Sequence, residues 1–214
     1  MKRRDFLIGT SMLTGLAFST RALALQETPM RKLTVFNNVS LDGYFTDSSG
    51  DMSWAHKQDP EWAAFTAENA GGEAELLFGR VTYEMMASFW PTPQALQIAP
   101  TVAEGMNRMR KSVFSRTLDS AAWQNSRVIK GDLVTEVRKM KAKSGPDMLL
   151  MGSGTIIAQL TDARLIDEYQ IVVTSTILGV GRTMFDGVQG RPSLRLQRTR
   201  SFGNGNVVLW YSTT

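Results

Sequence analysis

Short runs rich in β-forming residues alternate along the chain with segments of helical character. The runs that predict strands cover residues 32–37, 75–78, 112–115, 126–129, 147–151, 167–173, 194–202 and 207–212. The segments that predict helices cover residues 59–69, 80–88, 101–110, 132–143 and 155–160. Turn-rich residues 39–51, a loop at 91–98 and a glycine-rich loop at 179–190 lie between them. Strands that alternate with helices predict one α/β domain with a mainly parallel sheet and helices on both of its faces.

Capping and turn residues sharpen two of these boundaries. Asp59 followed by Pro60 is the N-cap and first-turn signature of a helix start. Gly203, Asn204 and Gly205 stand between the last two predicted strands, and this composition is a hairpin signal. The C-terminal hairpin is antiparallel, so the predicted sheet is mixed although most of its strands are parallel.

The first 24 residues have the three parts of a removable export signal. Lys2, Arg3 and Arg4 form a positive start, residues 6–18 are mildly apolar, and residues 22–24 (Ala-Leu-Ala) form a small-x-small cleavage site. The order Arg-Arg-Asp-Phe-Leu resembles the twin-arginine consensus. We therefore expect a twin-arginine signal peptide at 1–24, a linker at 25–31 and the folded domain at 32–214. The expected location is the periplasm, with the export machinery as a transient partner. An ordinary amphipathic helix and an uncleaved anchor stay open as alternatives.

Composition narrows the classes of function. The chain has 214 residues and a formal net charge of +4, but the predicted signal peptide holds three of these net charges, so the remainder is nearly neutral. Nucleic-acid-binding domains usually carry a concentrated basic patch, and we expect no such partner here. The chain has no cysteine and a single histidine, which excludes disulfides and thiolate nucleophiles and leaves no expectation of a metal site.

Three predicted strands end in residues suited to binding phosphate. Gly152, Ser153, Gly154 and Thr155 follow a buried strand and open a helix, whose first N–H groups favour an anion. Residues 79–84 (Gly-Arg-Val-Thr-Tyr-Glu) repeat this strand–glycine–helix order, and residues 115–117 (Ser-Arg-Thr) end a third strand. Each motif alone has a simpler interpretation: a tight turn, an exposed arginine at a helix start, or a polar strand end. Together, at one edge of a parallel sheet, they favour one extended, multiply phosphorylated ligand.

A family resemblance rests on six segments in order. They are Ser-Leu-Asp-Gly-Tyr at 40–44, Leu-Phe-Gly-Arg-Val-Thr-Tyr-Glu at 77–84, Phe-Ser-Arg-Thr-Leu at 114–118, Leu-Met-Gly-Ser-Gly-Thr at 150–155, Leu-Ile-Asp-Glu-Tyr at 165–169 and Ile-Leu-Gly-Val-Gly-Arg-Thr-Met-Phe at 177–185. This order resembles the dihydrofolate reductase superfamily. Within it, the chain resembles the C-terminal reductase domain of the bifunctional riboflavin-biosynthesis deaminase/reductase.

The resemblance implies a dihydrofolate reductase-like three-layer fold with about eight strands. It implies an NADPH-dependent reductase that transfers a hydride to a C=N or C=O bond of a pterin- or pyrimidine-like substrate, as 5-amino-6-(5-phosphoribosylamino)uracil reductases do. It also implies a homodimer. Residues carried over from the family are Gly79, Arg80 and Thr82 at cofactor phosphate; Ser115, Arg116 and Thr117 near the adenosine ribose and its 2′-phosphate; Gly152, Ser153, Gly154 and Thr155 at the pyrophosphate; and 38–43 as a mobile loop beside the nicotinamide.

The substrate side departs from the family pattern. Tyr44 stands where the riboflavin-pathway reductase is expected to have a lysine, and Met151 where a glutamate is expected. Glu61 and Glu68 lie in the helix that holds the carboxylate of dihydrofolate reductase.

Four residues are substrate-side candidates from their chemistry. Asp42 is the candidate proton donor and His56 a second titratable group, and Trp54 or Trp90 offers a surface for a planar heterocycle. The simpler interpretations are a turn aspartate, a solvated histidine and core or rim tryptophans. An exported nucleotide- or flavin-binding module without turnover stays open beside the reductase, whereas a periplasmic interaction protein would not need the phosphate-binding motifs.

Overall fold

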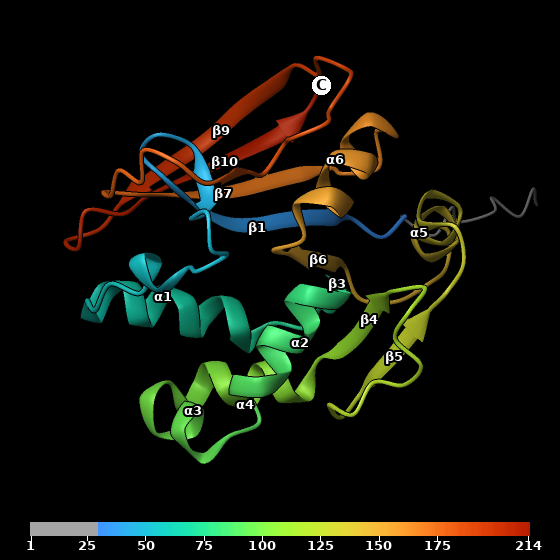
Figure 1. Cartoon of the computed structure of the whole chain (residues 1–214), viewed down its shortest axis with the longest axis horizontal. Helices are drawn as coiled ribbons and strands as arrows, with labels where there is room; N and C mark the ends of the chain where they lie inside the picture. The colour runs from blue at the N-terminus through green and yellow to red at the C-terminus, as the bar shows by residue number, and fades with distance from the viewer. Residues whose placement is uncertain (1–29) are drawn as a thin grey trace, which may run out of the picture.

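The computed structural model describes residues 30–214, so the predicted signal peptide and most of the linker lie outside the described residues (Figure 1). Eight strands form one sheet in the order β5-β4-β3-β6-β1-β7-β10-β9, and two short strands, β2 and β8, form a separate pair. The strands are β1 (Leu33–Ser40), β2 (Tyr44–Thr46), β3 (Glu75–Gly79), β4 (Arg110–Phe114), β5 (Ser126–Ile129), β6 (Met148–Met151), β7 (Glu168–Thr174), β8 (Arg182–Thr183), β9 (Leu194–Ser201) and β10 (Val207–Thr213). The six strands from β5 to β7 are parallel, whereas β10 runs antiparallel to both β7 and β9.

Helices cover both faces of the large sheet. They are α1 (Pro60–Gly71), α2 (Arg80–Phe89), α3 (Pro93–Ile98), α4 (Pro100–Arg108), α5 (Leu133–Lys141) and α6 (Gly154–Asp162), with a 3₁₀ turn at Ser53–Ala55. Figure 1 shows α1 to α4 on one side of the strands and α5 and α6 on the other. The chain crosses the sheet in both directions. Right-handed crossovers in opposite directions place their helices on opposite faces of the sheet.

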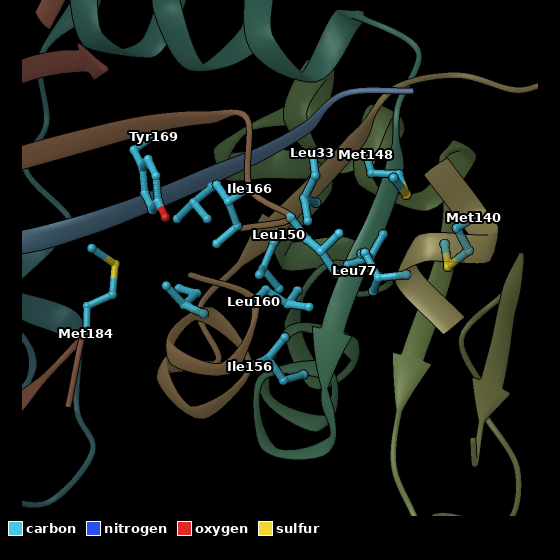
Figure 2. Packing of buried hydrophobic residues seen from close by; sticks show 14 of the residues in the cluster. Leu33, Leu77, Met140, Met148, Leu150, Ile156, Leu160, Ile166, Tyr169 and Met184 are labelled. Atoms are coloured by element: carbon cyan, nitrogen blue, oxygen red, sulfur yellow. The ribbon is translucent and has the colours of Figure 1, made fainter. Parts of the chain in front are cut away.

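Alternating residues of the central strands supply the two halves of the core. Leu77 belongs to the cluster that contains residues of α5 and α6, and its neighbours Leu76 and Phe78 belong to the cluster with α2 and α4. Figure 2 shows the first cluster, in which Leu33 and Leu150 lie close to side chains of α5 and α6. A third cluster, which includes Phe65 and Trp210, joins α1 to β7 and β10. The sheet is therefore held rigidly from both sides, and its strand ends are fixed in position.

The predicted fold is confirmed: eight strands in a mostly parallel sheet, helices on both faces and a C-terminal antiparallel hairpin. Two local predictions were wrong. Residues 91–98 contain α3, because the Thr92 side chain caps a helix that starts at Pro93. Residues 38–40 are not loop, because they continue β1 and pair with β7. Among residues 30–214, no helix combines the length and apolar character needed to cross a membrane.

Candidate functional site

A cleft of about 630 Å³ lies where β1, β3, β4 and β6 end, at the carboxyl edge of the parallel strands. Open α/β sheets bind ligands at this edge, and the volume is in the range of small-molecule sites. Its lining consists of Phe36, Asn37, Asn38, Phe45, Thr46, Gly50, Met52, Gly79, Arg80, Val81, Thr82, Met85, Met86, Phe114, Met151, Gly152, Ser153, Gly154, Thr155, Ile156, Gly181, Arg182, Thr183 and Asp186.

A single hydroxyl joins the ends of β3 and β6. The Ser153 Oγ accepts a hydrogen bond from the Gly79 N–H at 2.8 Å and donates one to the Thr82 hydroxyl at 2.9 Å. Ser153 has a positive φ of 60°, which turns its side chain away from its own helix and toward β3. The two strand–glycine–helix motifs predicted from sequence are therefore one structural unit.

The turn between β6 and α6 requires glycine at position 152. Gly152 has a φ of +59°, and a Cβ there would lie 2.6 Å from the Thr82 methyl carbon. Its N–H donates to the buried Asn37 Oδ1 at 2.6 Å, and the Asn37 Nδ2 lies 3.1 Å from the Met184 sulfur. Asn37 thus fixes the turn from the adjacent strand β1, and the backbone comes close to the floor of the cleft.

The start of α6 has the properties of an anion site. Its N-cap side chain, Ser153, is committed to Gly79 and Thr82 and makes no capping hydrogen bond. Across residues 30–214, we find no hydrogen-bond partner for the Gly154 and Thr155 N–H groups, and both residues line the cleft. Unpaired N–H groups and the helix dipole favour a negative group at this position. The donor set fits a phosphate or pyrophosphate.

The opposite wall comes from the glycine-rich loop after β7. Its strand β8 pairs with β2, and this pair places Thr46 and Thr183 along the cleft. Two aspartates fasten the loop: Asp42 accepts hydrogen bonds from the backbone N–H groups of 178 and 179, and Asp162 accepts from those of 189 and 190. The loop is therefore held at both ends, with the cleft between it and the sheet.

Charged side chains in the lining are confined to exposed positions. They are Arg80 at the start of α2, Arg182 of β8 and Asp186 beyond it. The Arg80 guanidinium pairs with Glu84 one turn further along the helix, at 2.8 Å. The two arginines come from opposite walls, an arrangement suited to the phosphates of a ligand that lies along the cleft.

Seven predicted cofactor residues line this one cleft: Gly79, Arg80, Thr82, Gly152, Ser153, Gly154 and Thr155. The third motif lies beside it. Phe114 lines the cleft, and residues 115–117 follow it directly. The Ser115 Oγ accepts hydrogen bonds from the Thr117 and Leu118 N–H groups and so closes the turn after β4, while Arg116 is exposed.

The structure does not bring the predicted substrate residues into the lining. Trp54 donates to the Asp51 carbonyl, His56 is exposed, and Trp90 packs beside Phe89 and contacts the Met86 sulfur. Glu61 pairs with Arg200 and Glu68 is exposed, so these α1 carboxylates also lie outside the lining.

Asp42 has a structural role, of which the sequence indicated the turn but not the hydrogen bonds to the loop after β7. Hydrogen bonds from the Ser40 hydroxyl and from the Gly179 and Leu178 N–H groups lower the pKa of Asp42 below its ordinary value. Its carboxylate is outside the lining of the cleft and is ionised at neutral pH. These contacts explain its place in the Asp-Gly turn, and its catalytic role stays a prediction.

Several lining residues carried no recognisable signal in the sequence. Asn37 and Phe45 reach the site through strand pairing and loop packing, and Met52, Met85 and Met86 resemble ordinary core residues in a linear pattern. One signal was available: Asn37 and Asn38 are adjacent polar residues in the C-terminal half of β1, toward the edge where a ligand site is expected.

Comparison with known proteins agrees with this architecture. The family model described as "RibD C-terminal domain" matches residues 31–208. The uncharacterized protein YyaP of Bacillus subtilis (strain 168) is 26% identical over 181 residues, which cover 85% of this chain and 94% of YyaP.

Solved structures share the fold. A putative riboflavin biosynthesis protein from Shewanella sp. PV-4 is similar with a TM-score of 0.66 and 24% identity, over 86% of this chain and 99% of that one. Dihydrofolate reductase from Enterococcus faecalis, solved in complex with NADP(H), is similar with a TM-score of 0.59 and 14% identity, over 86% and 96% of the two chains. Since the family model spans most of the sequence, the chain belongs to the RibD C-terminal domain family of reductase-like proteins.

Proposed function

We propose that this protein is an NADPH-dependent reductase that transfers a hydride to a C=N or C=O bond of a small cyclic substrate. One observation carries the proposal: the cleft joins two unpaired helix N–H groups to arginines on both walls. Phosphate groups match these donors in charge and geometry. Family membership and the NADP(H)-bound state of the Enterococcus relative support a nicotinamide cofactor.

In this proposal the β6–α6 turn holds the pyrophosphate at the Gly154 and Thr155 N–H groups. Arg80 and Arg182 neutralise phosphate charge from the two walls, and Arg116 lies just beyond Phe114 for the phosphate on the adenosine ribose. The nicotinamide supplies the hydride when bound. The protein's own contribution is to orient both reactants between the sheet and the β8 loop.

The reaction needs one proton besides the hydride. A bound nicotinamide would supply the hydride to the carbon of the C=N or C=O bond, and the nitrogen or oxygen would need a proton. Among the described residues, Asp186 is the one carboxylic acid in the lining, and it is exposed. Water that enters at this rim is therefore our proposed source of the proton.

The decisive experiment combines binding and turnover. Calorimetric titration of the full chain with NADPH and with NADH is expected to show binding, with NADPH preferred. Oxidation of NADPH is then followed across dihydropterins, ribosylaminopyrimidines and small cyclic imines and ketones. Absence of NADPH binding contradicts the proposal, and binding without turnover across the panel favours a nucleotide-binding module.

We propose the periplasm as the protein's location, supported by the twin-arginine pattern at its start. The full chain should then appear in the periplasmic fraction of its host. Replacing Arg3 and Arg4 together by lysine keeps the charge and is expected to leave the protein in the cytoplasm. Equal periplasmic amounts of both forms would contradict twin-arginine export.

A further inference from the structure

Five apolar side chains form what we call the methionine wall of the cleft: Phe36, Met52, Met85, Met86 and Met151. Phe36 of β1 and Met151 of β6 are register partners in neighbouring parallel strands, so their side chains lie on the same face of the sheet. Met86 and Met151 both pack against the cluster between the sheet and α2. Phe36, Met86 and Met151 therefore share an apolar surface beside the β6–α6 turn, and Met52 and Met85 add to the apolar lining.

None of the five side chains of the methionine wall carries a charge. Arg80, Arg182 and Asp186 are all exposed, and α1 contributes no side chain to the lining. A carboxylate or phosphate pressed against these uncharged side chains would lose part of its hydration, which is unfavourable. The wall thus selects against a charged substrate. The exposed arginines Arg80 and Arg182 and the start of α6 instead favour the charges of a phosphorylated cofactor.

One polar group interrupts this surface. Asn38 lies two residues beyond Phe36 on the same face of β1, and it lines the cleft. Its Oδ1 is buried and has no hydrogen-bond partner among the described residues. A side-chain amide has an oxygen acceptor and a nitrogen donor, and flipping the amide group exchanges their positions. A buried oxygen without a partner is costly, and rotation of the amide toward the cleft would let a ligand with one polar group satisfy it.

We infer that the substrate is a neutral, planar and largely apolar carbonyl or imine compound with one polar group that meets Asn38. This inference rests on the proposed reductase function and names its substrate class. Methionine side chains are flexible and polarizable, so the wall adapts to aromatic rings of different outline. Substrates that carry a phosphoribosyl or carboxylate tail against the wall are excluded.

The test compares two quinones that share a ring system and differ in charge. Menadione is neutral, and 1,4-naphthoquinone-2-sulfonate is anionic. Each is titrated into the full chain loaded with NADP⁺, which cannot reduce them, so the measurement gives the dissociation constant without turnover. We expect menadione to bind at least about tenfold more tightly, equivalent to about 1.4 kcal/mol. Equal affinity, or tighter binding of the sulfonate, overturns the inference.

Turnover gives a second measurement with the same pair. Reduction of menadione transfers two electrons as a hydride from NADPH and takes up one further proton, which yields menadiol and NADP⁺. The neutral quinone is expected to have the higher kcat/KM. If NADP⁺ itself does not bind, the proposed function fails. If NADP⁺ binds and menadione does not, the substrate inference fails alone.

A matched pair of variants locates the effect on the wall. Met151→Glu introduces a charge, and Met151→Gln introduces a neutral side chain of the same shape. We expect Met151→Glu to weaken menadione binding at least tenfold more than Met151→Gln. Urea denaturation of both variants serves as the check on folding, and menadione is titrated at saturating NADP⁺. Equal losses in the two variants would show that charge at the wall is irrelevant and would overturn the inference.

Discussion

The two edges of the large sheet use polar residues in opposite ways. At the amino edge of the parallel strands, Glu75 is buried and binds Arg31, Arg127 and Ser112, with contacts of 2.6 to 2.9 Å. At the carboxyl edge, the Gly154 and Thr155 N–H groups and the Asn38 oxygen have no partner within residues 30–214. Polar groups that are fully paired serve the fold, whereas unpaired groups that face a cleft are available to a ligand.

Hydrogen bonds, ion pairs and a cation–π contact stabilise the buried charges at the amino edge. Burial alone would raise the pKa of Glu75, but hydrogen bonds from Ser112 and Arg31 and the charges of Arg127 and Arg31 bring it below its ordinary value. Lys111 is completely buried and donates to three backbone carbonyls, with its ammonium 4.3 Å from the centre of the Trp123 ring. We therefore expect substitutions at this edge to change stability and those at the other edge to change binding.

The largest effect is expected for Glu75→Gln. The change leaves the buried Arg31 guanidinium without a counter-charge, and breaking one side of a buried pair costs about 3 kcal/mol. Urea denaturation at neutral pH should show this loss, while the dissociation constant for NADPH stays within twofold. Glu168→Gln is the matched control, because its exposed pair with Lys32 contributes less than about 1 kcal/mol. Similar losses in the two variants would contradict the assignment of the amino edge to stability.

A pH dependence is expected from Lys111. Burial lowers the pKa of Lys111 to about 8 from its ordinary value near 10.5, so between these values the unfolded chain binds more protons than the folded one. Stability from this group therefore rises as pH increases from 8 to 10.5, by on the order of 3 kcal/mol. The measurement is the difference in unfolding free energy between the natural chain and Lys111→Met at several pH values. A difference that stays constant from pH 7 to 11 would show that Lys111 titrates normally.

The amino edge also shows the limit of sequence reasoning. The element order and the carboxyl-edge motifs could be predicted, because strand, turn and helix signals are local and parallel strands end at one edge. Nothing local links Glu75 to Arg31 and Arg127, because Glu75 is on β3, Arg31 precedes β1 and Arg127 is on β5, and they meet only in the assembled sheet. For the same reason the methionines of the cleft resembled core residues, and the substrate role of Trp54 and His56 stays a prediction.

At the carboxyl edge, Gly154→Asp is expected to weaken NADPH binding by about 100-fold, or 2.7 kcal/mol. The new carboxylate would occupy the anion position at the start of α6. A Cβ added at residue 154 would lie 3.1 Å from the Phe45 ring. Gly154→Ala is the control, since it adds only the Cβ and should cost much less affinity. Stability to urea should fall by less than in Glu75→Gln. Unchanged NADPH affinity in Gly154→Asp would mean that the cofactor phosphates bind at another position.

The smallest effect is expected for Arg182→Gln, and it tests whether the β8 wall takes part in cofactor binding. Arg182 is exposed, so its attraction to a phosphate is screened, and its loss should weaken NADPH binding about fivefold, or 1 kcal/mol. The effect should shrink between low and high salt, because screening reduces the contribution of the natural arginine. Arg195→Gln on the exposed edge strand β9 removes the same charge far from the lining and should leave the affinity unchanged. If both variants weaken binding equally, the arginine acts through net charge alone, and the glycine turns of α2 and α6 hold the cofactor without help from the opposite wall.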